Sequence, residues 1–345
     1  MHLSDFAYEL PEKLIAQEPV TPRDSSRMLV VNRADRTWQD ARFTDFPSFI
    51  QPNDAVVLNN TSVFPARLIG EKNPSGGRVE LFLISEREPG IWEALVKPAR
   101  RIGVGAHINF GSSSLCAEVT QCLPEGLRIV NLQCEGSLEQ ELERVGQTPL
   151  PPYIKRPGGS STEDRKRYQT VYARQRGAIA APTAGLHFTP RVLEEVTARQ
   201  ARLVEITLHV GYGTFEPVRV DEIDEHSVGP EHYEISQKAA AAINSSRERG
   251  GRVVATGTTT ARALESAVDD GGRVQPRNDL TRLTIRPGYP FRAVEVLLTN
   301  FHLPQSSLLV LVAAFAGLDL VLQAYRHAVE AEYRFYSYGD CMLII

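Results

Sequence analysis

Histidine side chains that could transfer a proton stand in three polar stretches of this sequence. They are His187 in Ala181-Pro-Thr-Ala-Gly-Leu-His-Phe-Thr189, His209 in His209-Val-Gly-Tyr-Gly-Thr214, and His302 in Thr299-Asn-Phe-His302. Histidine titrates near neutral pH and is the most frequent general acid or base. A lone histidine beside apolar residues is more often structural, so what favours chemistry is its repeated placement beside glycine, threonine or asparagine.

Two carboxylates and a threonine-rich stretch add further candidate chemistry. Glu231 and Asp340 lie close to Tyr233 and Tyr338, and a carboxylate beside aromatic rings could hold a cationic ligand. Gly257-Thr-Thr-Thr-Ala-Arg262 precedes a predicted helix, and it either binds an anion through backbone amides or simply starts that helix. The sequence has no P-loop, no dinucleotide-binding glycine pattern and no Gly-x-Ser-x-Gly elbow.

An alternation of helices and strands must position these residues. Strands are predicted at Val204–Val210, Arg252–Ala255 and Val294–Leu298, and helices at Arg191–Arg202 and Gln237–Arg249. In an open α/β sheet with parallel strands, the loops that follow the strands meet at one edge. We therefore expect the polar stretches to form one site at that edge.

Between Ala66 and Gln147 the pattern changes to short strands separated by turns. Several short strands at regular spacing are typical of a small barrel or sandwich. We therefore predict a β domain, residues 66–149, inserted in an α/β main domain formed by residues 1–65 and 150–345. The six predicted strands are Arg67–Lys72, Arg78–Ile84, Trp92–Val96, His107–Phe110, Leu115–Gln121 and Leu127–Leu132.

A basic connector follows this block. It runs from Leu150 to Arg176 and interleaves arginines and lysines with Tyr153, Tyr168 and Tyr172, whose rings could stack on bases. A run of charges is also common on an ordinary solvated surface, so both interpretations stay open. The connector residues that we expect to hold RNA are Lys155, Arg156, Arg165, Lys166 and Arg167.

The composition is that of a globular protein with two domains. The chain has 345 residues, of which 42% are hydrophobic, and its net charge of −4 gives no global basic character. The four cysteines have no Cys-x-x-Cys spacing, so we predict free thiols and no metal site. The first residues do not resemble a signal peptide, and the longest apolar run, 308–318, is too short to span a bilayer. We expect a cytoplasmic protein in which this run is a buried strand or helix.

Many ordered motifs together resemble one known family, the S-adenosylmethionine:tRNA ribosyltransferase-isomerases of queuosine biosynthesis. The resemblance covers nearly the full chain and is far more specific than any single motif. The motifs are Asp5-Phe-Ala-Tyr-Glu-Leu-Pro11, Arg23-Asp-Ser-Ser-Arg27, Leu58-Asn-Asn-Thr61, Pro65-Ala-Arg67, Leu150-Pro-Pro-Tyr-Ile154, Arg167-Tyr-Gln-Thr-Val-Tyr172, Ala181–Thr189, Thr207–Phe215, Thr299–Pro304 and Tyr333-Arg-Phe-Tyr-Ser-Tyr-Gly-Asp340.

The resemblance implies a fold and a reaction. The fold is an α/β main domain with an inserted six-stranded β-barrel. The reaction moves the ribosyl part of S-adenosylmethionine onto 7-aminomethyl-7-deazaguanine at the wobble position of tRNA and isomerises it, which gives epoxyqueuosine and releases adenine and methionine. S-adenosylmethionine is a substrate here, no metal is required, and no membrane or obligate protein partner is implied. The alternative is a divergent member that binds S-adenosylmethionine or RNA without this chemistry.

Residues and resemblance together give the expected site. His187 is our first choice for proton transfer, and the other candidate catalytic residues are His209, Glu231 and Asp340. The sequence departs from the family pattern at Gly229, where the family has its second histidine, and at Gln305, where it has a lysine. The expected substrate-binding residues are Asn59, Asn60, Thr61, Arg67, Pro182, Thr183, Gly185, Gly211, Thr214, Gly257, Thr258, Thr259, Arg262, Asn300 and His302.

Overall fold

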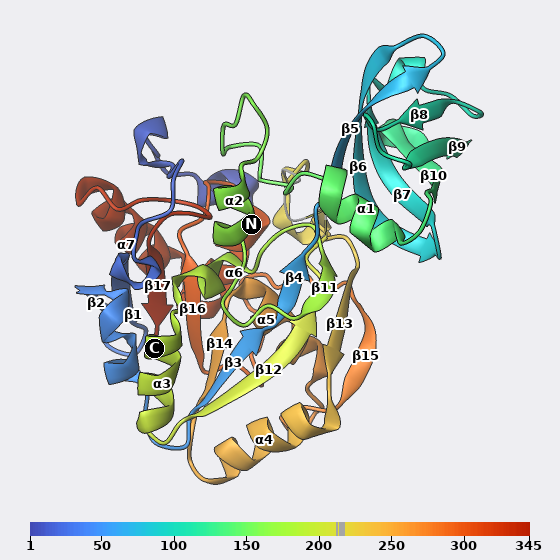
Figure 1. The fold of residues 1–345 in the computed structure, drawn as a ribbon. Coiled ribbons are helices and arrows are strands. Elements are labelled where there is room, and N and C mark those ends of the chain that lie inside the picture. The colour runs from blue at the N-terminus through green and yellow to red at the C-terminus, as the bar shows by residue number, and fades with distance from the viewer. Residues whose placement is uncertain (212, 214–217) are drawn as a thin grey trace.

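A large mixed sheet forms the centre of the main domain in the computed structural model, which describes residues 1–211, 213 and 218–345 (Figure 1). Its central strands β12, β3, β14 and β16 are parallel, and antiparallel strands extend it on both sides. Within the described residues the order is β15 (Arg277–Thr281), β13 (Glu231–Ile235), β12 (Arg202–Leu208), β3 (Ala55–Asn59), β14 (Val253–Thr256), β16 (Val296–Asn300), β17 (Cys341–Ile344), β1 (Arg27–Asn32) and β2 (Thr37–Arg42).

Helices cover both faces of this sheet. Helix α3 (Pro190–Ala198) packs on one face, against Val56 and Val254, and its N-cap Thr189 and first-turn Pro190 are those that the sequence indicates. The helices on the other face pack against Val57 and Ala255. They are α4 (Gln237–Glu248), α5 (Thr258–Ala267), α6 (Ser307–Ala316) and α7 (Leu318–Glu330).

The apolar run after residue 307 is a helix, α6. The sequence alone left a strand or a helix open, because a run that is buried all round has no periodicity to tell them apart. Among the described helices none is by itself long and apolar enough to cross a membrane, and α6 with α7 reaches that length only as a pair bent by 115°.

The predicted fold class is confirmed, because the inserted block closes into a barrel (Figure 1). Each predicted strand of the block corresponds to one barrel strand, and alternate residues such as Leu81, Ala94 and Val130 fill the interior. The strands follow the order β10 (Leu127–Gln133), β7 (Ile91–Lys97), β6 (Gly77–Glu88), β5 (Arg67–Asn73), β8 (His107–Asn109) and β9 (Cys116–Cys122).

The chain enters and leaves the barrel at one point. Strand β4 (Thr61–Val63) leads in, and helix α1 (Leu138–Val145) leads out. The backbones of Arg67 and Gln147 exchange two hydrogen bonds, of 3.3 and 2.8 Å, which hold the two connections side by side. We propose residues 66–149 as one domain and residues 1–65 with 150–345 as the other.

Gly146 tests how tightly this junction is packed. A Cβ atom at Gly146 would lie 2.3 Å from the carbonyl oxygen of Pro65, so Gly146→Ala forces the two connections apart. We expect a loss of about 1–3 kcal/mol in the free energy of unfolding, the usual cost of overpacking, measured by urea denaturation. Gly103→Ala, where a Cβ meets nothing within 4 Å, is the matched control. Equal stability of the two variants would contradict this view of the junction.

Candidate active site between the barrel and the sheet

A cleft of about 1370 Å³ lies between the barrel and the main sheet. The barrel and helix α1 supply Trp92, Glu93 and Leu142, and the sheet side supplies His209 and Glu231. The cleft brings together four of the expected site residues, which are His209, Gly211, Glu231 and Arg262.

A buried ion pair lies in the wall of this cleft. Arg262 in α5 donates through Nη1 to Glu231 Oε2, and Glu231 Oε1 accepts a 2.9 Å bond from the backbone of Gly211. Arg262 Nε donates to the carbonyl of Leu283, 3.0 Å away, but its buried Nη2 has no partner among the described residues. A buried donor without an acceptor is costly. The NH2 group at Nη2 of Arg262 is therefore left for an anionic ligand.

His209 presents its ring to the cleft from the end of β12. Its Nδ1 lies 2.7 Å from the hydroxyl of Thr61, which also donates a longer, 3.4 Å bond to the carbonyl of Gln175. When the hydroxyl proton points to Gln175, Thr61 accepts from Nδ1–H, and Nε2 keeps a lone pair that can accept a proton. Burial, helped by the nearby His232, lowers the pKa of His209 to about 4, so the ring is neutral at pH 7.

Gly177 makes room for this ring. Gly177 belongs to β11 (Gln175–Ala178), which pairs with β4 beside the barrel junction. A Cβ atom at Gly177 would lie 2.7 Å from His209 Cε1. The close approach of backbone to ring therefore requires glycine at this position.

The cleft also contains the positions at which this sequence departs from the family pattern. His226 lines it with its Nε2 2.7 Å from the hydroxyl of Ser307, and burial lowers the pKa of His226. Gly229 and Gln305 line the same cleft, and a Cβ at Gly229 would meet no atom within 4 Å. A small vacant volume therefore stands where the family pattern has an imidazole.

His187 lies in a separate buried cluster and does not line the cleft. Its Nδ1 is 2.7 Å from the hydroxyl of Ser26, its Nε2 is 3.4 Å from the amide nitrogen of Asn300, and burial lowers the pKa of His187 to about 4. His302 bonds to Thr299, 2.8 Å away, and burial lowers its pKa to about 3. These two histidines and Asn300 are thus held by protein groups.

Two further expected residues bond to the sheet itself. The side chain of Asn59 bonds to the backbone N–H and carbonyl of Leu208, at 3.0 and 2.9 Å. Asn60 bonds to the side chains of Glu205 and Thr207. Both amides therefore link the end of β3 to β12. Thr61 does not line the cleft, but its hydroxyl bonds to His209, which does.

The other expected residues lie outside the cleft. Asp340 accepts 2.8 Å bonds from the backbones of Arg27 and Arg334, and burial raises the pKa of Asp340. Arg67 is in the barrel, 3.4 Å from Glu80. Thr214 falls outside the described residues. The remaining expected residues, none of which lines the cleft, are Pro182, Thr183, Gly185, Gly257, Thr258 and Thr259.

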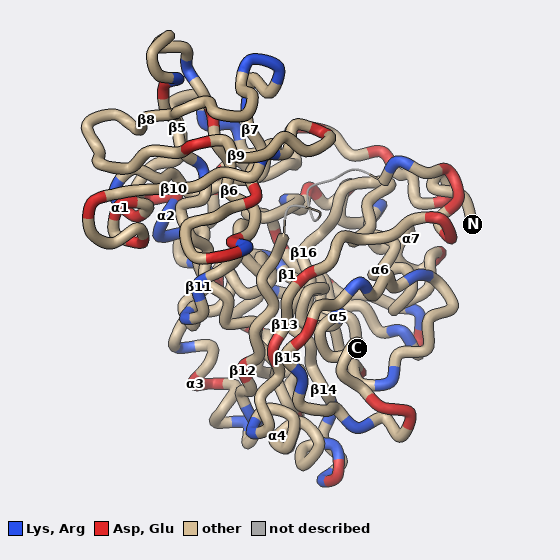
Figure 2. Tube along the Cα trace, turned by 90° about the vertical axis from the view of Figure 1, so that its right-hand side faces the viewer, with Lys and Arg blue, Asp and Glu red and all other residues tan. Residues whose placement is uncertain are grey.

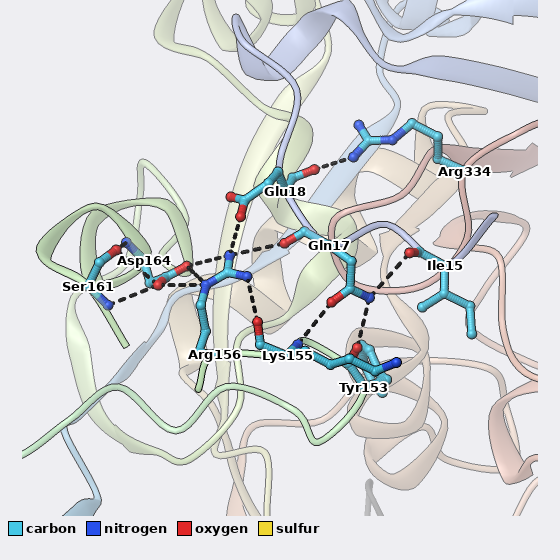
Figure 3. Close-up of polar contacts among 9 residues, drawn as sticks. All are labelled: Ile15, Gln17, Glu18, Tyr153, Lys155, Arg156, Ser161, Asp164 and Arg334. Atoms are coloured by element: carbon cyan, nitrogen blue, oxygen red, sulfur yellow. Dashed lines mark hydrogen bonds and ion pairs between the residues drawn. The ribbon is translucent and has the colours of Figure 1, made fainter. Parts of the chain in front are cut away.

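Most cations of the basic connector already have protein partners. Figure 3 shows Arg156 bonded to Asp164, to Glu18 and to the carbonyl of Gln17. Lys155 pairs with Glu12 at 2.7 Å.

Helix α2 (Thr162–Arg167) is part of the connector and faces the acidic helix α1, as Figure 2 shows. Arg165 pairs with Glu143 of α1 at 2.6 Å. Arg167 donates to the hydroxyl of Thr21 and to a backbone carbonyl, and Lys166 has no ion pair within the described part of the chain. The number of cations in the connector therefore exceeds the number that are available to bind RNA.

Neither the barrel side of the cleft nor Gly177 could be predicted from the sequence. Phe64 and Trp92, whose ring centres are 5.4 Å apart, line the cleft, but in the sequence they are indistinguishable from other core aromatics. Gly177 carries no signal in a single sequence, because its role depends on a ring more than thirty positions away. His226, one of the four histidines in the sequence that could act as acid or base, lines the cleft as well.

Comparison with known proteins gives full-length matches. A family model described as queuosine biosynthesis protein matches residues 3–344. Proteins from Pelotomaculum thermopropionicum and Symbiobacterium thermophilum, both named S-adenosylmethionine:tRNA ribosyltransferase-isomerase, are 48% and 49% identical over 345 residues, which is all of each chain. A crystal structure of S-adenosylmethionine tRNA ribosyltransferase from Thermotoga maritima is 35% identical, with a TM-score of 0.56 over 99% of this chain and 100% of that one.

The neutral buried His187 predicts an acid-labile fold. Its pKa falls from 6.5 to about 4 on folding, so the unfolded chain binds the extra proton between these pH values and the free energy of unfolding decreases as the pH falls. The loss from this residue is at most roughly 3 kcal/mol. Urea unfolding at pH 7 and pH 4.5 should show a smaller pH dependence for His187→Gln than for the wild type. The exposed His107→Gln is the control, and an unchanged pH dependence of His187→Gln would contradict the prediction.

Proposed function

Because this chain belongs to the queuosine biosynthesis protein family, we propose that it is an S-adenosylmethionine:tRNA ribosyltransferase-isomerase. It transfers the ribosyl group of S-adenosylmethionine to 7-aminomethyl-7-deazaguanine at the tRNA wobble position, isomerises it, and releases adenine and methionine. The observation that carries the proposal is full-length identity of nearly one half to proteins of this name, together with a cleft that holds a neutral histidine and a buried ion pair.

The cleft has the size and the groups for S-adenosylmethionine beside a nucleobase. Its 1370 Å³ exceeds the roughly 300–1,000 Å³ of pockets for one small ligand. Arg262 has a spare N–H for the methionine carboxylate. Glu86, Glu93 and Glu139 line the barrel side. Glu93 pairs with Arg87 and Glu139 with Arg176, so Glu86 is the one of the three without an ion pair among the described residues, and its carboxylate favours the cationic sulfonium and ammonium groups. The largely buried rings of Phe64 and Trp92 add apolar surface to the same side of the cleft.

His209 is the residue that we now favour as the base. The sulfonium acidifies the neighbouring 5′ carbon, and His209 Nε2 takes the proton from it. Adenine then leaves, the amine of the deazaguanine attacks, and methionine leaves in turn. A base whose pKa is about 4 is weak, so this scheme requires that the sulfonium supply most of the acidification and that the closed cleft exclude water. The absence of the family's second histidine at Gly229 favours a second candidate function, in which the protein binds the substrates without turnover.

Product release separates the two candidate functions. Mixing the wild type with S-adenosylmethionine and precursor tRNA should release adenine and methionine in equal amounts, as followed by chromatography. A tRNA with guanine at the wobble position lacks the amine nucleophile and should give no ribosyl transfer. If both substrates bind but neither adenine nor methionine is released, the protein is a member that binds the substrates without turnover.

Paired histidine variants test the assignment of the base. We expect His209→Asn to lower turnover by roughly a hundredfold or more, the scale of a lost general base. His187→Asn should retain far more turnover at a temperature where it is folded, because His187 does not line the cleft. Binding of S-adenosylmethionine, measured by calorimetry, is the control for both. If His187→Asn is folded and as inactive as His209→Asn, our first sequence-based choice is restored.

A further inference from the structure

A second, much smaller pocket lies on the main domain close to the cleft. Its volume is about 20 Å³, and its lining includes Arg23, Arg167, His187 and Tyr338. A volume of this size accepts about one oxygen-sized group, since a water needs roughly 10–15 Å³. The pocket is therefore too small for a nucleoside but can receive one oxygen of a ligand that sits at its mouth.

The arginines around this pocket are held by oxygens that carry no net charge. Arg23 donates to the carbonyls of Gln169, at 2.5 Å, and Lys166, at 2.9 Å. Arg167 donates to the hydroxyl of Thr21 and the carbonyl of Val20. These bonds fix the guanidinium groups without neutralising them, in contrast to Lys155, Arg156 and Arg165, which all pair with carboxylates.

Arg23 and Arg167 are the charged side chains of the pocket lining, and further charges of both signs lie around it. Burial and the carboxylates of Asp164 and Glu18 raise the pKa of Tyr338, whereas Arg156 and Arg167 lower it. Glu163 acts on Arg23 from beyond ion-pair distance, and Arg334, near His187, donates to the carbonyl of Glu18. Neither Arg23 nor Arg167 forms an ion pair with any carboxylate that the structure describes. Burial and the like charge of Arg167 lower the pKa of Arg23, as expected for neighbouring cations.

Two buried donors at the pocket have no partner. They are Nε of Arg167 and the hydroxyl of Tyr338, and both belong to side chains that line the pocket. A buried donor without a partner costs stability unless a ligand or water satisfies it. Two guanidinium groups, of which Arg167 has a spare Nε–H, and the spare hydroxyl of Tyr338 around an oxygen-sized hollow match an oxyanion, and phosphate in particular.

We propose that this pocket binds a backbone phosphate of the tRNA, next to the nucleotide being modified. The inference rests on the proposed function, which supplies a polyanionic substrate. Tyr336 lines the cleft and Tyr338 lines the pocket, and two residues span at most about 7 Å of chain, so the phosphate belongs to a nucleotide close to the reacting one. The exposed Lys166 lies beside it on α2. The pocket, more than the connector as a whole, holds the RNA.

Tyr338→Phe is the sharpest test, because the hydroxyl that it removes has no protein partner and the fold loses no bond. Filter binding with precursor tRNA should show an affinity about three- to tenfold lower than that of the wild type, while the Kd for S-adenosylmethionine and the melting temperature stay unchanged or improve. Unchanged tRNA affinity would overturn the proposal.

Charge variants give an independent measure. Arg23→Gln with Arg167→Gln should weaken tRNA binding at least tenfold and reduce the slope of log K against log salt by about 0.7–0.9 for the one lost phosphate. Lys155→Gln with Arg165→Gln removes the same formal charge from paired sites and is the matched control. An equal effect of both pairs would mean that overall charge, and not the pocket, determines affinity.

Inorganic phosphate distinguishes the two possible sources of the anion. It should compete with tRNA on the wild type more strongly than on the Arg23→Gln, Arg167→Gln variant. If phosphate binds the wild type but both variants keep full tRNA affinity, the pocket takes a free anion and the proposal fails. Turnover of the wild type is measured alongside: an active wild type with unaffected variants refutes only the phosphate pocket, whereas an inactive wild type with affected variants refutes only the proposed activity.

Discussion

Burial of the central parallel strands on both faces is the constraint on which the site depends. Strands β3, β14 and β16 are buried at every residue, so polar side chains at their ends have no bulk water to solvate them. Some of these polar side chains form hydrogen bonds inside the protein, as Asn59 does with the backbone of Leu208. At β12 the chain instead opens to the barrel, and there His209 faces a cleft. The candidate site thus lies where the sheet is covered by the barrel and not by its own helices.

Local patterns in the sequence located most strands and helices, but they left a barrel or a sandwich open for the inserted block, and the barrel was implied by the family resemblance. Short strand-like runs at regular spacing, separated by turn residues, located all six barrel strands, and Thr189 with Pro190 marked the start of α3. The apolar run that forms α6 was ambiguous, because both of its sides are buried. What no local pattern contains is the closure of the barrel beside β12, which depends on contacts between distant segments.

The candidate site could be predicted only in part, for a physical reason. Residue type and position after a strand proposed His209 and Arg262, and proximity to Tyr233 proposed Glu231, but the same position rule proposed His187 and Asn300 equally well. A histidine is available to a ligand or used by the fold according to its partners, and those of His187 are Ser26 and Asn300, far away in the chain. The same holds for the basic connector, where a salt bridge such as that of Arg156 with Asp164 decides whether a cation is available.

The paired backbones of Arg67 and Gln147 have a consequence for how such an enzyme can change. An inserted segment whose two ends are adjacent can be lost, exchanged or lengthened without altering the order of strands in the sheet that carries it. The wall with Trp92 and Glu93 and the wall with His209 and Glu231 can therefore diverge at different rates. Substitutions on the barrel wall can accumulate without disturbing the ion pair of Arg262 and Glu231 on the opposite wall.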